Sequence, residues 1–274
     1  MSQLPLSNNL LEQAKNLLKK KKINEALRLC HKANLICPES DKAIDLSINI
    51  YSASKRFPEA ISWLSKRLAE YATPWRAAVL IDLLRIDKAS KEDLETAARK
   101  YLAIYPDSPE LLLSAGAAFQ SIGKIDDAIR IYEKRLEIIP DDAGVINNLG
   151  HCRLDRGDME GALAEWRRIF SMPAPKHIQD TARFNLARAL LLRGDIMAAE
   201  SECNILCQEY PDNAAYTGLR AKIRARYGQR PEAIIEAREA LEKDRGDVAS
   251  WLRLVKLTGE SGDLEGAFGL LEQA

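Results

Sequence analysis

The chain is poor in the residues that most often carry chemistry. It has three histidines and five cysteines among 274 residues. The cysteines lie at no disulfide or zinc-finger spacing, which fits a reducing compartment. The sequence contains no glycine-rich phosphate loop, no Gly-x-Ser-x-Gly and no His-Glu-x-x-His motif. We therefore expect no catalytic site, no bound metal and no cofactor.

Net charge and long apolar runs are also lacking. The 40 basic and 40 acidic residues cancel, so no global field favours nucleic acid or a membrane surface. No stretch approaches the ~18 apolar residues of a membrane span, and residues 1–9 lack the features of a signal peptide. The lysines at 19–22 are interpreted as a solvated turn, because the aromatics and further basic residues of a nucleic-acid site are missing. These absences predict a cytoplasmic protein without nucleic-acid or membrane partners.

What the chain does contain is a repeat, marked by a small residue that precedes a bulky helix face. Successive anchor positions are 34 residues apart four times, then 37 apart once, then 34 apart twice. The anchors are Ala26, Ala60, Leu94, Ala128, Ala162, Ala199, Ala233 and Ala267. A period of 34 residues is typical of stacked helix pairs, each of which buries its apolar face only against its neighbours.

The repeat around Ala162 shows how the sequence specifies one helix pair. Asp141 and Asp142 follow Pro140 and can cap the first helix, because a short acidic side chain accepts hydrogen bonds from the free amides of a helix start. Gly157 can end that helix, since glycine has no Cβ penalty in the left-handed conformation. Gly150 on the first helix is expected to face Ala162 on the second, with Trp166 filling the remaining gap.

This pattern resembles the tetratricopeptide repeat (TPR) family. Trp251 and Leu254 stand where the family places its first Trp and Leu, and Tyr51 stands where it places its Tyr. The resemblance implies an all-α, right-handed superhelical solenoid of antiparallel helix pairs, formed by the whole chain as one domain of about seven and a half repeats. The expected repeats are 7–40, 41–74, 75–108, 109–142, 143–179, 180–213, 214–247 and a truncated 248–274.

Three departures from the pattern carry expectations. The third repeat has Asp82, Arg85 and Leu94 at motif positions, so its first helix is expected to be shifted or longer. Three extra residues within 171–180 are expected to form a proline-bearing loop. The last repeat stops inside its second helix without the polar cap that repeat arrays need. We therefore expect a longer full-length protein, and self-association through the uncovered face of the C-terminal repeat.

The histidines and cysteines are interpreted individually. His31 and His177 lie in no motif and are expected to be solvated. Cys203 and Cys207, four residues apart on one helix, could share a metal, but Cys203 occupies the packing position of Trp166 and is better explained as a core residue.

The TPR resemblance also predicts a binding groove, because the first helices of such arrays line the concave surface. The middle of this surface is expected to be apolar, at Val79, Leu83, Leu113 and Ala117. Asn148 and Asn185 would form a short amide ladder for a peptide backbone, similar to that of protein O-GlcNAc transferases. Basic residues beyond them would favour carboxylates or phosphates; the alternative is that they only solvate the helix face. The candidate groove residues are Asn147, Asn148, His151, Asn185, Arg188, Lys222, Arg226, Arg253 and Lys256.

These features predict a non-catalytic scaffold that binds an extended, anionic peptide or a partner protein. The alternative is the substrate-recruiting or dimerising N-terminal arm of a larger bacterial enzyme, such as a glycosyltransferase or sulfotransferase. A chaperone-tail adaptor is disfavoured, because Ala215 and Leu219 stand where the carboxylate clamp of the family needs basic residues.

Overall fold

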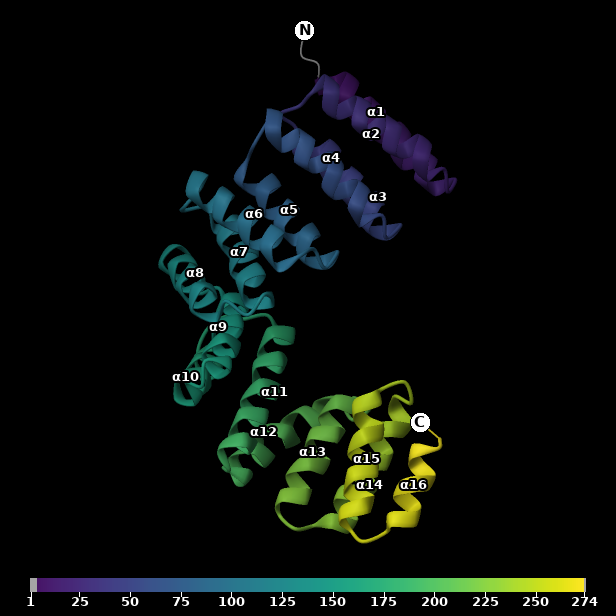
Figure 1. Ribbon diagram of the computed structural model, residues 1–274, viewed down its shortest axis with the longest axis vertical. Helices are drawn as coiled ribbons and strands as arrows, with labels where there is room; N and C mark the ends of the chain where they lie inside the picture. The colour runs from purple at the N-terminus through teal and green to yellow at the C-terminus, as the bar shows by residue number, and fades with distance from the viewer. Residues whose placement is uncertain (1–3, 274) are drawn as a thin grey trace. The chain divides into compact units, whose positions relative to one another are not determined.

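The computed structural model describes residues 4–273, which form sixteen α-helices and no strand (Figure 1). The prediction of an all-α array is confirmed. The helices are α1 (Leu4–Lys19), α2 (Ile23–Ile36), α3 (Asp41–Ala53), α4 (Phe57–Glu70), α5 (Pro74–Ile86), α6 (Lys91–Ile104), α7 (Pro109–Ser121), α8 (Ile125–Ile138), α9 (Ala143–Asp155), α10 (Met159–Ile169), α11 (Lys176–Arg193), α12 (Ile196–Glu209), α13 (Ala214–Arg226), α14 (Arg230–Lys243), α15 (Val248–Glu260) and α16 (Leu264–Leu271).

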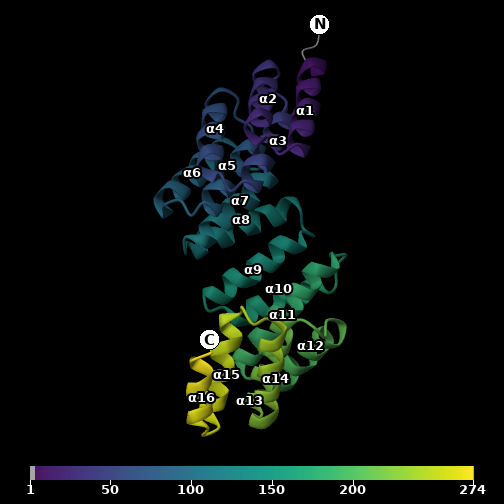
Figure 2. The same ribbon diagram turned by 90° about the vertical axis from the view of Figure 1, so that its right-hand side faces the viewer.

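The chain divides into two compact units. The first comprises Met1–Pro140 with helices α1 to α8, and the second comprises Asp141–Ala274 with helices α9 to α16. Within each unit, helices that follow one another in the chain pack side by side (Figure 2). The division falls between the fourth and fifth expected repeats, so each unit contains four helix pairs. A single continuous solenoid stays a prediction.

The helix starts follow from capping side chains. Asp142 caps α9, with its Oδ1 accepting the backbone N–H of Val145 at 3.1 Å. Asp158 caps α10 in the same way, accepting the N–H of Gly161 at 2.9 Å. The expected cap of α9 is confirmed, and each carboxylate satisfies an amide that the first turn leaves unpaired.

The turns within the helix pairs adopt a left-handed backbone. Gly157 has a φ of 90°, and Gly123, Gly194, Gly228 and Gly262 are also positive. In the first two pairs the same position is held by Lys21 and Lys55, with φ of 58° and 56°. In the third pair the left-handed residue is Lys88, one position earlier, with a φ of 56°. The turn at Gly157 was predicted, whereas the lysine turns were not.

The glycine on the first helix faces the aromatic ring rather than the anchor alanine. A Cβ added at Gly150 would lie 2.7 Å from Nε1 of Trp166, and one at Gly116 would lie 2.5 Å from the ring of Tyr132. Trp166 and Tyr132 are both fully buried. The expected contact between Gly150 and Ala162 is therefore corrected: glycine makes room for the ring.

The first helix of the third repeat is shifted by one residue. α5 has 13 residues, as α3, α7 and α9 do, but it spans 74–86, whereas the 34-residue period from α3 and α7 places this helix at 75–87. The expected shift is confirmed, and the helix is not longer. Asp82 has a specific partner there, because Ser114 Oγ of α7 donates to its Oδ2 at 2.8 Å. Leu83 is buried rather than exposed on the surface of the middle repeats.

The extra residues between the fifth and sixth repeats lengthen a helix as well as the loop before it. α11 has 18 residues and starts at Lys176, directly after Pro175. Lys176 Nζ forms an ion pair with Asp180 at 2.9 Å, and Tyr210 Oη donates to Asp180 at 2.5 Å. The added turn is thus held to α12 by specific polar contacts.

His31 is not solvated, contrary to expectation. Its ring stacks on Trp63 with a centroid distance of 4.6 Å, and Tyr51 Oη lies 3.3 Å from its Nε2. Burial, followed by the charge of Arg67, lowers the pKa of His31. His177 is exposed, as expected.

Cys203 and Cys207 are core residues, as expected. Cys203 is fully buried, and its Sγ lies 4.0 Å from that of Cys207. All five cysteines are free.

A buried arginine holds part of the first unit together. Arg76 of α5 is 1% exposed. Its guanidinium donates to Asp41 Oδ1 at 2.8 Å, to the carbonyl of Tyr71 at 2.9 Å and to the carbonyl of Pro38 at 2.6 Å. This side chain joins α5 to the loop ends of the preceding pairs.

Candidate ligand-binding surface of the second unit

The first helices of the four pairs in the second unit carry a row of nitrogen-bearing side chains. His151 of α9, Arg188 of α11, Lys222 of α13 and Lys256 of α15 each occupy the ninth position of their repeat. The last three are exposed, whereas His151 is partly buried. We call Arg188, Lys222 and Lys256 the basic ladder.

The ladder charges converge with a fourth cation, Arg253. The pKa of Lys222 is lowered by partial burial and then by the charges of Arg253, Arg188 and Lys256. All four effects on Lys222 act in the same direction. Two carboxylates lie near the other cations: Glu260 Oε1 is 3.7 Å from Lys256 Nζ, and Asp247 acts on Arg253. We call the four cations the cation cluster. Their mutual repulsion makes the surface receptive to an anion.

Arg253 is positioned by a glycine. A Cβ added at Gly218 of α13 would lie 2.1 Å from Arg253 Nη1, so the guanidinium rests directly on this glycine and would have to move if the residue were larger. Arg253 Nη1 donates to Ser250 Oγ at 3.3 Å, while its buried Nε has no hydrogen-bond partner among the described residues. Burial lowers the pKa of Arg253, and the nearby Asp247 opposes this.

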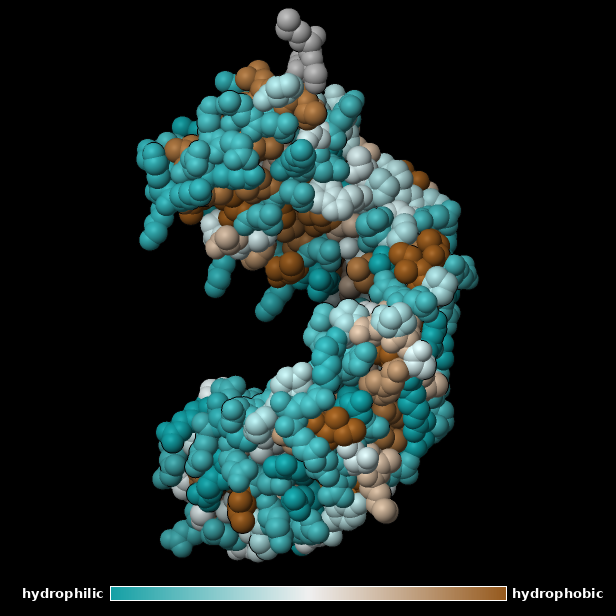
Figure 3. Space-filling view, turned by 180° about the vertical axis from the view of Figure 1, so that it is seen from behind, coloured by the Kyte–Doolittle hydropathy of each residue, from teal (hydrophilic) through white to brown (hydrophobic). Residues whose placement is uncertain are grey.

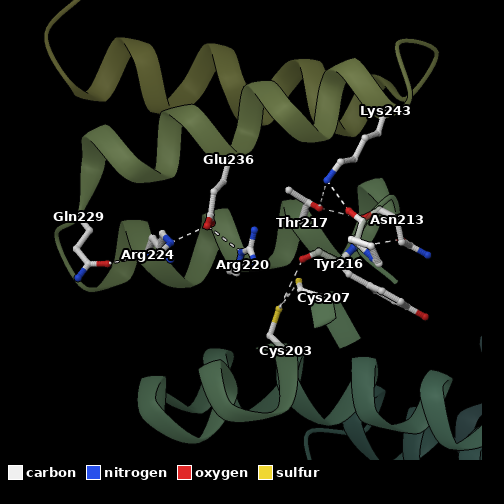
Figure 4. Close-up of polar contacts among 11 residues, drawn as sticks. Cys203, Cys207, Asn213, Tyr216, Thr217, Arg220, Arg224, Gln229, Glu236 and Lys243 are labelled. Carbon is white, nitrogen blue, oxygen red and sulfur yellow. Dashed lines mark hydrogen bonds and ion pairs between the residues drawn. The ribbon is translucent and has the colours of Figure 1, made fainter. Parts of the chain in front are cut away.

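Other basic residues of α13 are already neutralised. Glu236 of α14 lies between Arg220 and Arg224, with its Oε1 2.8 Å and 2.7 Å from their Nε atoms (Figure 4). Arg226 is exposed in the last turn of α13 and does not act on the pKa of Lys222. The structure therefore brings Lys222 into the cluster and leaves Arg226 outside it.

The asparagines do not form the expected ladder. Asn185 is 5% exposed, and its Nδ2 lies 3.0 Å from Asn147 Oδ1 and 2.9 Å from His151 Nε2. An amide nitrogen only donates, so Nε2 of His151 is the acceptor and its proton lies on Nδ1. Asn185 thus orients His151 instead of offering its amide to a ligand, and Asn147 is also buried at 9% exposure. Asn148 remains partly exposed.

His151 closes the N-terminal end of the cluster as a neutral ring. Its pKa is lowered mainly by burial; Asp155 raises it and Arg188 lowers it further. The ring packs edge-on against Trp166 at 5.4 Å between centroids. The position of His151 is therefore fixed by the core, and it senses the charge of Arg188.

An aromatic pair lies beside the ladder. The guanidinium of Arg188 sits over the ring of Phe184 at 5.6 Å, and Phe184 packs on Tyr216 at 5.5 Å. The part of the second unit displayed in the lower half of Figure 3 is mainly hydrophilic, with separate small hydrophobic patches. Gly218 carries a contact that the sequence alone did not reveal.

No group of three or more potential metal ligands occurs among residues 4–273. Over the same part of the chain, every helix is too short or too polar to span a bilayer.

Comparison with solved structures identifies the architecture. A tetratricopeptide repeat protein from Parabacteroides merdae matches with a TM-score of 0.63 at 13% identity, over 97% of this chain and 91% of that one. PilW, a widely conserved type IV pilus biogenesis factor, matches with a TM-score of 0.63 at 16% identity, over 72% of this chain and 90% of that one. A chain of the APC/C hetero-tetramer Cut9–Hcn1 matches with a TM-score of 0.59 at 14% identity, over 93% of this chain and 49% of that one.

These likenesses show that the chain has the TPR fold, as the repeat period predicts. No protein-family model matches the sequence. No curated protein matches it either.

Proposed function

We propose that the protein is a non-catalytic binding scaffold, and that the cation cluster holds an acidic, extended segment of a partner protein. The observation that carries this proposal is the placement of Arg188, Lys222 and Lys256 at one position of three helices, with Arg253 seated on Gly218 beside them. In keeping with this placement, the other three cations lower the pKa of Lys222. A carboxylate placed among them would replace repulsion by attraction, because a nearby opposite charge favours the charged form.

The fold supports the same function without fixing it. Stacked helix pairs present extended surfaces that suit partner proteins. One matched structure is itself a complex of different chains, the hetero-tetramer Cut9–Hcn1. A scaffold role therefore agrees with the use of this fold elsewhere, while the choice of an acidic ligand depends on the cluster.

The test measures binding of a fluorescent aspartate-rich peptide at two salt concentrations. Arg188→Glu and Lys222→Glu should each weaken binding about ten-fold at ~0.1 M salt and much less at ~1 M, because the Debye length falls from ~10 Å to ~3 Å. Arg238→Glu, the same charge change at an exposed position of α14, is the control and should have little effect. Equal affinities for all three variants would contradict the proposal.

The partly exposed Asn148 is proposed to contribute a neutral contact to the ligand backbone. Asn148→Ala should weaken binding of the peptide by about the same factor at both salt concentrations, because a neutral hydrogen bond contributes ~0.5–1.5 kcal/mol and is not screened by salt. A loss that disappears at ~1 M salt would assign Asn148 an indirect, electrostatic role.

We also propose that copies of the protein associate through α16. Phe268 is 68% exposed, whereas Leu27 and Leu163 at the same repeat position are 4% and 0% exposed beneath the next helix pair. Leu264 and Leu271 are exposed on α16 as well. An apolar face of this kind favours association, and a second copy is the occupant we propose.

The oligomeric state tests this contact. Light scattering should show a mass that rises with protein concentration, and Phe268→Glu should abolish the rise. Met197→Glu is the control, because Met197 on α12 is 79% exposed. A strictly monomeric parent protein would contradict this proposal and leave the cation cluster unaffected.

A further inference from the structure

The basic ladder repeats at the spacing of the helix pairs. Arg188, Lys222 and Lys256 share one position on α11, α13 and α15, and each of these helices contacts the next. The axes of packed helices lie about 8–10 Å apart. The backbone positions of successive ladder residues are therefore about 8–10 Å apart, in one direction across the helices.

A second row runs beside the ladder, one helical turn earlier on the same three helices. It consists of Phe184, Gly218 with Arg253 seated on it, and Leu252, which is 59% exposed. Residues four apart on a helix have Cβ atoms about 5–6 Å from each other. The surface thus offers a narrow track, with the three ladder cations along one side and Phe184, Arg253 and Leu252 along the other.

We propose that this track selects a ligand in the polyproline II conformation with an acidic side chain at every third residue. This inference rests on the proposed function. Polyproline II has three residues per turn and a rise of about 3.1 Å, so every third side chain points the same way and recurs after about 9.3 Å. That interval matches the spacing of the ladder.

Other conformations fit the track less well. Same-face residues of a β-strand recur after about 6.8 Å or about 13.6 Å, neither of which matches. An α-helix brings every seventh residue to one face after about 10.5 Å, but its diameter of about 10–12 Å exceeds the separation of the two rows. A polyproline II segment is also preformed in isolation, whereas short isolated helices are marginal.

The test compares peptides of equal composition and charge. The first is Asp-Pro-Pro-Asp-Pro-Pro-Asp, with the carboxylates spaced by three. The second is Pro-Pro-Asp-Asp-Asp-Pro-Pro, with the carboxylates adjacent. We expect the first to bind about ten-fold more tightly by fluorescence anisotropy at low salt. A third, alanine-rich peptide with aspartates spaced by seven tests the helical alternative.

A variant that moves one charge separates spacing from total charge. Lys222→Ala combined with Ala215→Lys keeps the net charge and shifts the cation seven residues along α13, to another exposed position. In this double variant the affinity for the spaced peptide should fall about ten-fold, while the affinity for the peptide with adjacent carboxylates should not change. The two proline peptides should therefore bind it equally. The circular dichroism spectrum checks that its fold is retained.

The outcomes distinguish the two proposals. If both proline peptides bind the parent protein equally and Lys222→Glu weakens both, the acidic ligand stands and the spacing is wrong. Tighter binding of the alanine-rich peptide would also overturn the polyproline II geometry. If none of the three peptides binds at low salt, the proposed function itself fails.

Discussion

The two units close their helix pairs with the same turn but with different residues. In the first unit Lys55 adopts a φ of 56° and Arg56 N–H donates to the carbonyl of Tyr51 at 2.9 Å. In the second unit Gly157 has a φ of 90° and Asp158 N–H donates to the carbonyl of Arg153 at 2.8 Å. The hydrogen bond that spans the end of the helix is therefore common to both. The packed helix pair dictates the turn, and glycine only makes it less costly.

The units also differ in how they use cations. Arg76 in the first unit is buried, with an anion and two carbonyls accepting its hydrogen bonds. Lys222 in the second unit is exposed, and the charges that act on its pKa are three further cations. A cation with satisfied donors holds a structure together, whereas one among like charges is available to a ligand.

The largest effect should come from removing the buried cation. Arg76→Ala leaves the carbonyls of Pro38 and Tyr71 without their donor and opens a cavity, so the free energy of unfolding of the first unit should fall by ~3–5 kcal/mol. Chemical denaturation combined with hydrogen exchange in α3 to α5 measures the loss. Arg85→Ala removes an exposed arginine of the same helix and should cost less than ~0.5 kcal/mol. Similar losses of stability for both variants would contradict the structural role of Arg76.

An exchange of turn residues should give a smaller effect and tests the first comparison directly. Lys55→Gly should stabilise the first unit by ~1 kcal/mol, because a left-handed conformation costs a non-glycine residue ~1–2 kcal/mol, and the greater freedom of glycine in the unfolded chain offsets part of this. Gly157→Lys should destabilise the second unit by a similar amount. Denaturation of both variants provides the measurement. A destabilising Lys55→Gly would mean that the lysine side chain itself supports the turn.

The repeat architecture was predictable because its signals are local. Anchor alanines, capping aspartates and turn glycines recur within single helix pairs, and a period of 34 residues identifies them without knowledge of the neighbours. The ladder positions of Arg188, Lys222 and Lys256 followed from the same period. A lysine at a left-handed turn gives no such signal, since lysine occurs at exposed positions of every kind.

The contacts that the sequence missed join residues far apart in the chain. Asn185 is buried by Asn147 and His151 of the preceding repeat, across the one junction that has three extra residues. Arg253 lies over Gly218 of the preceding repeat. Such pairings depend on how closely successive repeats approach, and a single-repeat pattern does not contain that distance.

The smallest expected effect concerns the pKa values of two histidines, one in each unit. The pKa values of His31 and His151 are both lowered, chiefly by burial. The folded protein therefore binds their protons less readily than the unfolded chain, whose histidines titrate near ~6.5. Their contribution to stability is present above that pH and is lost as the pH falls through the folded pKa values.

The neighbouring charges differ, because Arg188 lowers the pKa of His151 and Arg67 lowers that of His31. Arg188→Glu should therefore raise the pKa of His151 and leave that of His31 unchanged, as followed by NMR titration of the ring protons. Lys256→Glu, the same charge change at the far end of the ladder, is the control and should leave both histidines unaffected. If the pKa of His151 does not respond to Arg188→Glu, then the His151 ring does not lie next to the cation cluster.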